Sequence, residues 1–202
     1  MTRVAEAEVR CGALRPLAAV LALCAAAAAA GGPAAPREYL DEQTAATVTV
    51  VGEPLVFALP RPELAANVRD YATLAAAAVN RAGKISYVLI AYFWSTVDAR
   101  LRRDPLPAAE PLALQADDRR LALALEGHSA HDAGIGERVH APPGSAAEPN
   151  VYRTDLATLR FIAAARRLTI LAESKGAPLT YDLWQDRRPA LQAFVRRMSG
   201  AD

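Results

Sequence analysis

The chain has 202 residues, of which 47 are alanine, with 23 basic and 22 acidic side chains. This length allows one domain or two small ones, and either can bury a hydrophobic core. Hydrophobic residues make up 52% of the chain, which excludes a disordered protein. The net charge of +1 excludes a globally basic nucleic-acid binder.

The first thirty residues are typical of a bacterial export signal. A weakly positive segment is followed by an uncharged stretch, 17–30, that ends in a run of alanines. This pattern predicts a secretory signal peptide at residues 1–30, with cleavage before Gly31. The stretch is shorter than the roughly 20 apolar residues that a permanent membrane-spanning helix needs. We therefore expect an exported protein that is periplasmic or secreted.

The two cysteines of the chain, Cys11 and Cys24, both lie in this leader. The mature domain would therefore contain no disulfide and no cysteine nucleophile. The segment Leu21-Ala22-Leu23-Cys24 resembles the lipobox of bacterial lipoproteins, although Leu23 stands where a small residue is usual. This resemblance implies lipidation of Cys24, and a membrane anchor there is the alternative to a free product.

Removal of the leader changes the electrostatic balance. The first thirty residues hold one more basic than acidic side chain, so the remainder carries no net charge. A neutral domain has no long-range attraction to DNA, RNA or anionic lipid. We expect no nucleic-acid partner, and contact with a membrane only through the lipid anchor of the alternative above.

The mature chain begins with a stretch of glycine, proline and alanine. We expect a flexible linker at 31–43 and a single domain at 44–202. In the segment 44–59, β-branched residues are interrupted by Gly52-Glu53-Pro54, which predicts two short strands around a turn.

Residues 64–80 have two interpretations. Their alanines favour a helix capped near Gly83, whereas Asn80-Arg81-Ala82-Gly83 is typical of a turn between two strands. Residues 85–97 are apolar on both alternating faces, as in a central strand covered on both sides. We favour a hairpin through the turn, with the helix at 64–80 as the alternative.

The later segments predict two more hairpins and two helices. Leucines alternate on either side of a turn in residues 111–126, and residues 168–172 and 179–184 form the second hairpin. A short helix follows Thr154 or Asp155, and the last helix follows Asp186. The apolar face of that last helix consists of Leu191, Phe194, Val195 and Met198. The predicted fold class is α+β, with seven or eight strands in an antiparallel sheet or sandwich and short helices, including a C-terminal amphipathic helix.

A long irregular segment at 127–150 is too polar for the core, and such a loop is either functional or mobile. It contains all three histidines of the chain, His128, His131 and His140. Three imidazoles can hold zinc, so we consider a metal site here. A solvated loop in which the histidines do not meet is the simpler interpretation, because no HExxH helix positions them.

Other chemical motifs are incomplete. Trp94-Ser95-Thr96 ends the predicted central strand, but no motif places a base beside Ser95. Asp117 and Asp118 suit a turn, and the Arg-Arg pairs of the last helix suit a solvated face. We expect a non-catalytic binding or structural accessory domain of the bacterial envelope, with a protein or envelope component as its partner and no required cofactor. A metal-binding or metal-dependent protein that uses zinc at 128–140 is the second hypothesis.

Overall fold

A computed structural model of the chain describes residues 32–97, 112–143, 149–174 and 177–200. These residues belong to one compact unit, Gly31–Asp202. The predicted signal peptide and Cys24 lie outside the described residues. No helix within those ranges has both the length and the apolar composition that crossing a membrane requires.

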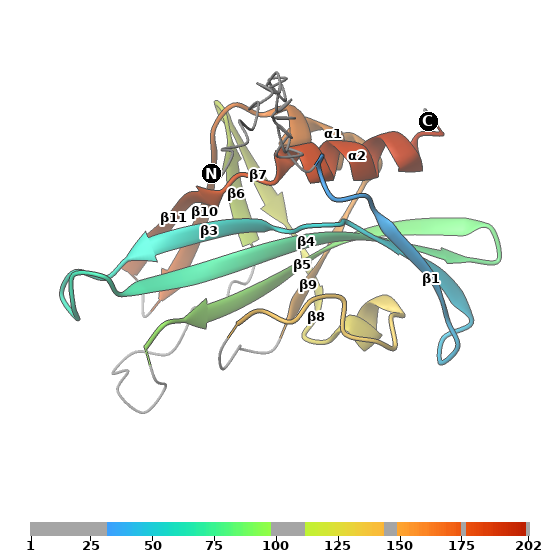
Figure 1. Cartoon of the computed structure of the whole chain (residues 1–202), viewed down its shortest axis with the longest axis horizontal. Coiled ribbons are helices and arrows are strands. Elements are labelled where there is room, and N and C mark those ends of the chain that lie inside the picture. Colours follow the sequence, from blue (N-terminus) through green and yellow to red (C-terminus); the bar gives the residue numbers. More distant parts are fainter. Residues whose placement is uncertain (1–31, 98–111, 144–148, 175–176, 201–202) are drawn as a thin grey trace, which may run out of the picture. The chain divides into compact units, whose positions relative to one another are not determined.

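Antiparallel strands dominate the unit and form a single sheet, of eleven strands within the described residues (Figure 1). Its hydrogen-bonded order is β7-β6-β10-β11-β3-β4-β5-β9-β8, and the β1–β2 hairpin pairs with β4 beyond the end of β3. The strands are β1 (Arg37–Asp41), β2 (Ala46–Val50), β3 (Leu55–Pro60), β4 (Arg69–Arg81), β5 (Lys84–Ser95), β6 (Leu112–Ala116), β7 (Arg119–Leu123), β8 (Leu125–Gly127), β9 (Asn150–Thr154), β10 (Leu168–Ser174) and β11 (Ala177–Gln185). The helices are η2 (Ala130–Ala133), α1 (Leu156–Ala164) and α2 (Arg188–Met198). The predicted α+β class with an antiparallel sheet is confirmed.

The two ends of the sheet come together. β7 and β8 stand at opposite ends of the strand order, yet only Ala124 separates them in the chain. The carbonyl oxygen of Ala124 accepts a hydrogen bond from the amide of Arg153 in β9 at 3.2 Å. The sheet is therefore strongly curved, barrel-like and nearly closed, rather than split into the two layers of a sandwich.

The longest hairpin joins β4 to β5 in the middle of the sheet. Their pairing runs without a break from Asp70–Ser95 to Arg81–Lys84. Ala82 and Gly83 form the turn, at φ of 51° and 82°, and positive φ values suit the right-handed twist of the flanking strands. The predicted hairpin is confirmed, and the alternative helix at 64–80 is wrong.

Four consecutive alanines of β4, Ala75–Ala78, are at most 2% exposed. Because successive strand residues point to opposite faces, Ala76 and Ala78 are buried on one face of the sheet and the other two on the opposite face. Alanine is depleted in strands, so packing rather than propensity decides the conformation here. Its small side chain lets both covering layers approach β4 closely.

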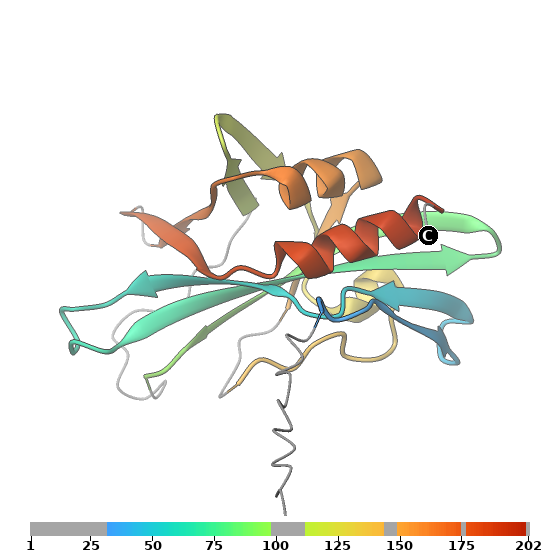
Figure 2. The same ribbon diagram turned by 45° about the horizontal axis from the view of Figure 1, so that its top comes forward.

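The helices α1 and α2 lie side by side over one face of the sheet (Figure 2). Leu159 and Ile162 of α1 are fully buried in the same core as Phe57 and Phe93 of the sheet. On α2, the predicted apolar face is buried at three of its four positions and half-buried at Met198. The C-terminal amphipathic helix is thus confirmed.

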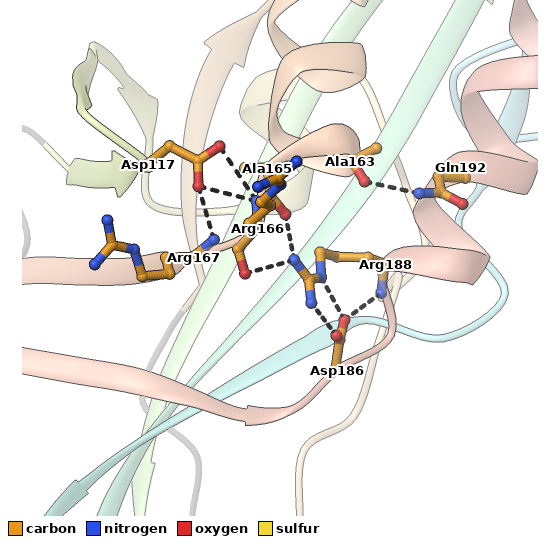
Figure 3. A network of polar contacts seen from close by, with 8 residues as sticks. All are labelled: Asp117, Ala163, Ala165, Arg166, Arg167, Asp186, Arg188 and Gln192. Carbon is orange, nitrogen blue, oxygen red and sulfur yellow. Dashed lines mark hydrogen bonds and ion pairs between the residues drawn. The ribbon is translucent and has the colours of Figure 1, made fainter.

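Polar contacts at the start of α2 cap the end of α1 (Figure 3). The guanidinium of Arg188 is ion-paired with Asp186 and donates to the carbonyl oxygens of Ala165 and, at 2.9 Å, Arg166. Gln192 donates to the Ala163 carbonyl at 2.9 Å. Carbonyls at a helix C-terminus have no partner within the helix, so these contacts satisfy them. Arg188 is therefore not part of a solvated helix face.

Asp117 ties the β6–β7 hairpin to the same junction. Its carboxylate accepts hydrogen bonds from the amides of Arg166 and Arg167 at 2.9–3.2 Å. These amides, the Arg167 amide most of all, lower the pKa of Asp117. The residue is a connection between distant segments as well as a turn residue.

The described residues 128–143, between β8 and β9, are buried at more positions than their polar composition predicts. Ile135 and Val139 are buried, at 0% and 4% exposure, so the segment contributes to the core after all. It lies on the face of the sheet away from α1 and α2. Residues 37–41, where we expected part of a linker, form β1, and the carboxylate of Asp41 in β1 accepts a hydrogen bond from the Gly136 amide.

The turn of the β4–β5 hairpin gives a first stability test. Gly83→Ala places a Cβ at a positive φ, and we expect the free energy of unfolding to fall by about 1 kcal/mol. Ala82→Asn should raise it by up to about 1 kcal/mol, because asparagine tolerates the left-handed conformation better than alanine. Denaturant unfolding measures both changes, and a loss of stability in both variants would contradict the turn geometry.

The buried alanines of β4 give a second test. Ala76→Leu and Ala77→Leu overfill opposite faces of the strand, and each should lower the free energy of unfolding by about 1–3 kcal/mol. The control is Ala157→Leu on the exposed side of α1, which should change stability by less than about 0.5 kcal/mol. Equal stability of all three variants would show that β4 is not packed closely on both faces.

Candidate functional site

The described residues 128–143, which follow β8, lie over part of the sheet face away from the helices. The β4–β5 register places Tyr71, Thr73, Tyr92 and Trp94 on this face. Tyr92 is 1% exposed and packs edge to face against His140, whose ring centroid is 6.0 Å away. Tyr71 and Trp94, further along the strands, are only half-buried. Partly exposed aromatic rings therefore lie near His140 and Pro143 of this segment.

A groove of about 400 Å³ lies at this position. Its volume falls in the lower part of the range for small-molecule sites, about 300–1,000 Å³. Four neighbouring strands line the groove, together with the β2–β3 turn, residues 140 and 143 of the segment between β8 and β9, and the residue before α2. The lining residues are Gly52, Glu53, Pro54, Val56, Tyr71, Thr73, Trp94, His140, Pro143, Trp184, Gln185 and Arg187.

Stacked aromatic rings form the most rigid part of the groove. Tyr71 and Trp94 are directly paired across β4 and β5, and their rings stack with centroids 4.2 Å apart and an interplanar angle of 13°. The indole Nε1 of Trp94 donates to Thr73 Oγ1 at 2.9 Å. This hydrogen bond satisfies the polar atom of the indole and holds its ring in place.

Trp184 of β11 forms the exposed wall of the groove. Its side chain is 52% exposed, which is unusual for so large an apolar group. The guanidinium of Arg69 lies 4.6 Å from the centre of the Trp184 ring, a cation–π contact that helps to orient it. Trp94 and Trp184 are the two tryptophans of the chain, and both line the groove.

The polar groups of the groove are largely neutral or paired. Arg187 and Glu53 form an ion pair at 3.5 Å, which balances their charges. Burial, and then the positive charge of Arg37, lower the pKa of His140 below its ordinary value, so its imidazole is neutral at pH 7. A neutral imidazole offers one hydrogen-bond donor and one acceptor, and the amide of Gln185 offers both kinds of group.

The three predicted metal ligands lie in different surroundings. His128 Nδ1 is 2.9 Å from Asn150 Oδ1, and His131 is exposed in η2. His140 is half-buried on Tyr92 and lines the groove. Within the part of the chain that the structure describes, no group of three or more histidine, cysteine, aspartate or glutamate side chains is placed to hold a metal. Zinc binding by these histidines stays a prediction.

The sequence points to two of the groove-lining residues, Trp94 and His140, but not to their neighbours in the groove. Trp94 was singled out at the end of a central strand, but its neighbour Ser95 has a structural role, because its hydroxyl donates to the Arg69 carbonyl at 3.5 Å. Tyr71 and Trp184 gave no local signal beyond their positions near strand ends. Their proximity depends on pairing between β11, β3, β4 and β5, which the sequence does not display.

Asp41 helps to position the segment that contributes His140 to the groove. Its buried carboxylate accepts hydrogen bonds from the amides of Gln43 at 3.0 Å, Thr44 at 3.3 Å and Gly136. The Gly136 amide is the largest cause of the lowered pKa of Asp41. The charged carboxylate thus links β1 to residues that lead to His140.

This link predicts a specific dependence of stability on pH. Because the pKa of Asp41 is lower in the folded than in the unfolded protein, its contribution is complete above the unfolded value of about 4 and is lost as pH falls through the folded value. Asp41→Asn should therefore lower the free energy of unfolding at pH 7, with a smaller difference from the wild type at pH 3. Urea unfolding at both pH values measures this, and an equal difference at both would contradict it.

No protein-family model, curated protein or solved structure matches the chain. A function must therefore be inferred from the groove itself.

Proposed function

We propose that the protein is a non-catalytic binding domain of the bacterial envelope, and that the aromatic groove is its binding site. The observation that carries this proposal is the position of both tryptophans and Tyr71 around one solvent-open groove. Exposed aromatic clusters mark interaction sites, and tryptophan and tyrosine contribute disproportionately to binding energy. The partner is a protein or another component of the cell envelope.

The polar contacts in the groove support binding rather than catalysis. Acid–base or nucleophilic catalysis needs a reactive group within hydrogen-bond reach of its base. Among the lining residues that the structure describes, Thr73 accepts a hydrogen bond from Trp94, and Glu53 pairs with Arg187. Neither pair is a nucleophile with its base. Burial, and then the positive charge of Arg37, lower the pKa of His140 and so disfavour a protonated imidazole.

Location is the first testable part of this proposal. Export with cleavage predicts a mature protein that begins at Gly31 and fractionates with the periplasm or the medium. Intact mass spectrometry of the protein recovered from cells would show this N-terminus, whereas a lipidated product would begin at Cys24 and fractionate with membranes. An uncleaved chain in the cytosol would contradict export.

Binding through the groove is the second testable part. We expect the purified protein to sediment with isolated envelopes of its source bacterium, and the variant Trp94→Ala/Trp184→Ala to bind at least tenfold more weakly. Truncating a central aromatic residue of a binding site commonly costs about 2 kcal/mol or more. The amount of sedimented protein at a series of envelope concentrations measures the affinity.

A matched control separates the groove from other exposed apolar groups. Leu64 is 45% exposed and is not among the groove-lining residues, so Leu64→Ala should bind like the wild type. Circular dichroism and thermal unfolding establish that each variant is folded. Equal binding by the control and the double tryptophan variant would show that the groove is not the site.

A further inference from the structure

We infer that the groove binds an uncharged glycan, whose sugar rings stack on the rings of Trp94 and Trp184. This inference rests on the proposed function, because it names the ligand class of the same groove. It follows from the combination of flat apolar rings, neutral polar groups at their edges and balanced charge.

The aromatic rings match the apolar faces of a sugar. A pyranose ring presents C–H groups on its flat faces and hydroxyl groups around its edge, so it needs an apolar plane bordered by polar groups. The stacking on Tyr71 and the hydrogen bond to Thr73 hold the Trp94 ring in one orientation. Trp184 adds a second, more exposed indole on β11, which β3 and β4 separate from the strand of Trp94. Rigid rings bind at a low cost in conformational entropy.

The polar groups at the groove edge match the hydroxyl groups of a sugar. Gln185, His140 and the Glu53–Arg187 pair provide donors and acceptors beside the rings. A hydroxyl group both donates and accepts, so it can pair with a neutral imidazole or a carboxamide and needs no charged counterpart. These groups are suited to fix the orientation of a ligand that stacks on the indoles.

The charges in the groove argue against charged ligands. Arg69 lies over the Trp184 ring, so a quaternary ammonium group that stacked on this indole would meet a cation. Single-stranded nucleic acid also stacks on aromatic rings, but it requires an unbalanced basic groove along its phosphates. Here Glu53 balances Arg187. We therefore infer that the ligand of this groove is uncharged.

A proline-rich peptide is the competing uncharged ligand, because such peptides dock in aromatic-lined grooves. Their backbone carbonyls accept hydrogen bonds, and an indole N–H is a suitable donor for them. The indole N–H of Trp94 instead donates to Thr73, within the protein. The groove therefore favours a ligand that uses the ring surface of Trp94 rather than its polar edge.

Tryptophan fluorescence tests the inference directly, because both tryptophans of the chain line the groove. The full-length protein is titrated separately with cellohexaose, maltohexaose and N-acetylchitohexaose, and with a proline decapeptide. We expect a saturable change in emission with at least one hexasaccharide. The single-tryptophan variants Trp94→Phe and Trp184→Phe should both respond to the same sugar.

Substitution at the groove edge adds a matched comparison. Gln185→Ala removes a hydrogen-bonding group from the groove, and we expect at least fivefold weaker sugar binding. Gln43→Ala removes the same group at an exposed position that does not line the groove, and affinity should stay unchanged. Equal affinities of the two variants for the sugar would show that Gln185 at the groove edge does not bind the sugar.

The outcomes separate this inference from the proposed function. No saturable response to any of the three sugars overturns the glycan inference. If the decapeptide alone binds, or if envelope sedimentation still depends on the two tryptophans, the groove remains a binding site with a different ligand. The variant Trp94→Ala/Trp184→Ala has no tryptophan, so its sugar binding is measured by isothermal titration calorimetry, and binding that survives in it would overturn the site itself.

Discussion

The structure depends on one strand, β4, that is covered on both faces at the close approach that alanine side chains allow. The side chains of residues 75–78 are single methyl groups and are at most 2% exposed, so both faces of β4 are covered here. Protein interiors are close-packed, and a larger side chain at these positions would displace a whole layer. An alanine-rich composition usually suggests a helical protein, but here consecutive alanines form a strand that is buried on both faces.

The elements predicted correctly are those with a strong local pattern. The two apolar faces of residues 85–97 and the turn at Ala82–Gly83 are enough to predict the hairpin, and helical spacing predicts α2. Average composition gave a wrong prediction where a few buried or paired residues fix the structure of a segment that is mostly polar. Ile135 and Val139 bury a segment that is polar on average, and β1 is held by backbone pairing to β2 although its own side chains are mostly charged or polar.

The candidate site could not be predicted in the same way, because its residues are separated in the chain. Lining residues extend from Gly52 to Arg187 and meet through the pairing of β11 with β3, β3 with β4 and β4 with β5. Nothing local in the sequence specifies these neighbours. The three histidines are close in the sequence, and this spacing suggests one site. The capped turn of η2 and the burial of Val139 nevertheless place them in different surroundings.

The groove and the core are products of the same register. Tyr71 pairs with Trp94 because the turn at Ala82–Gly83 sets the register along the whole hairpin. At roughly 3.4 Å per residue, this turn lies about 35 Å along the strands from the Tyr71–Trp94 pair. A slip by one residue would move Tyr71 to the helix-covered face and would break the stack. A ligand that contacts Trp94 and Trp184 together recognises the arrangement of β11, β3, β4 and β5 in the folded sheet. Its binding energy therefore adds to the stability of the folded sheet, since the unfolded chain does not bring these two indoles together.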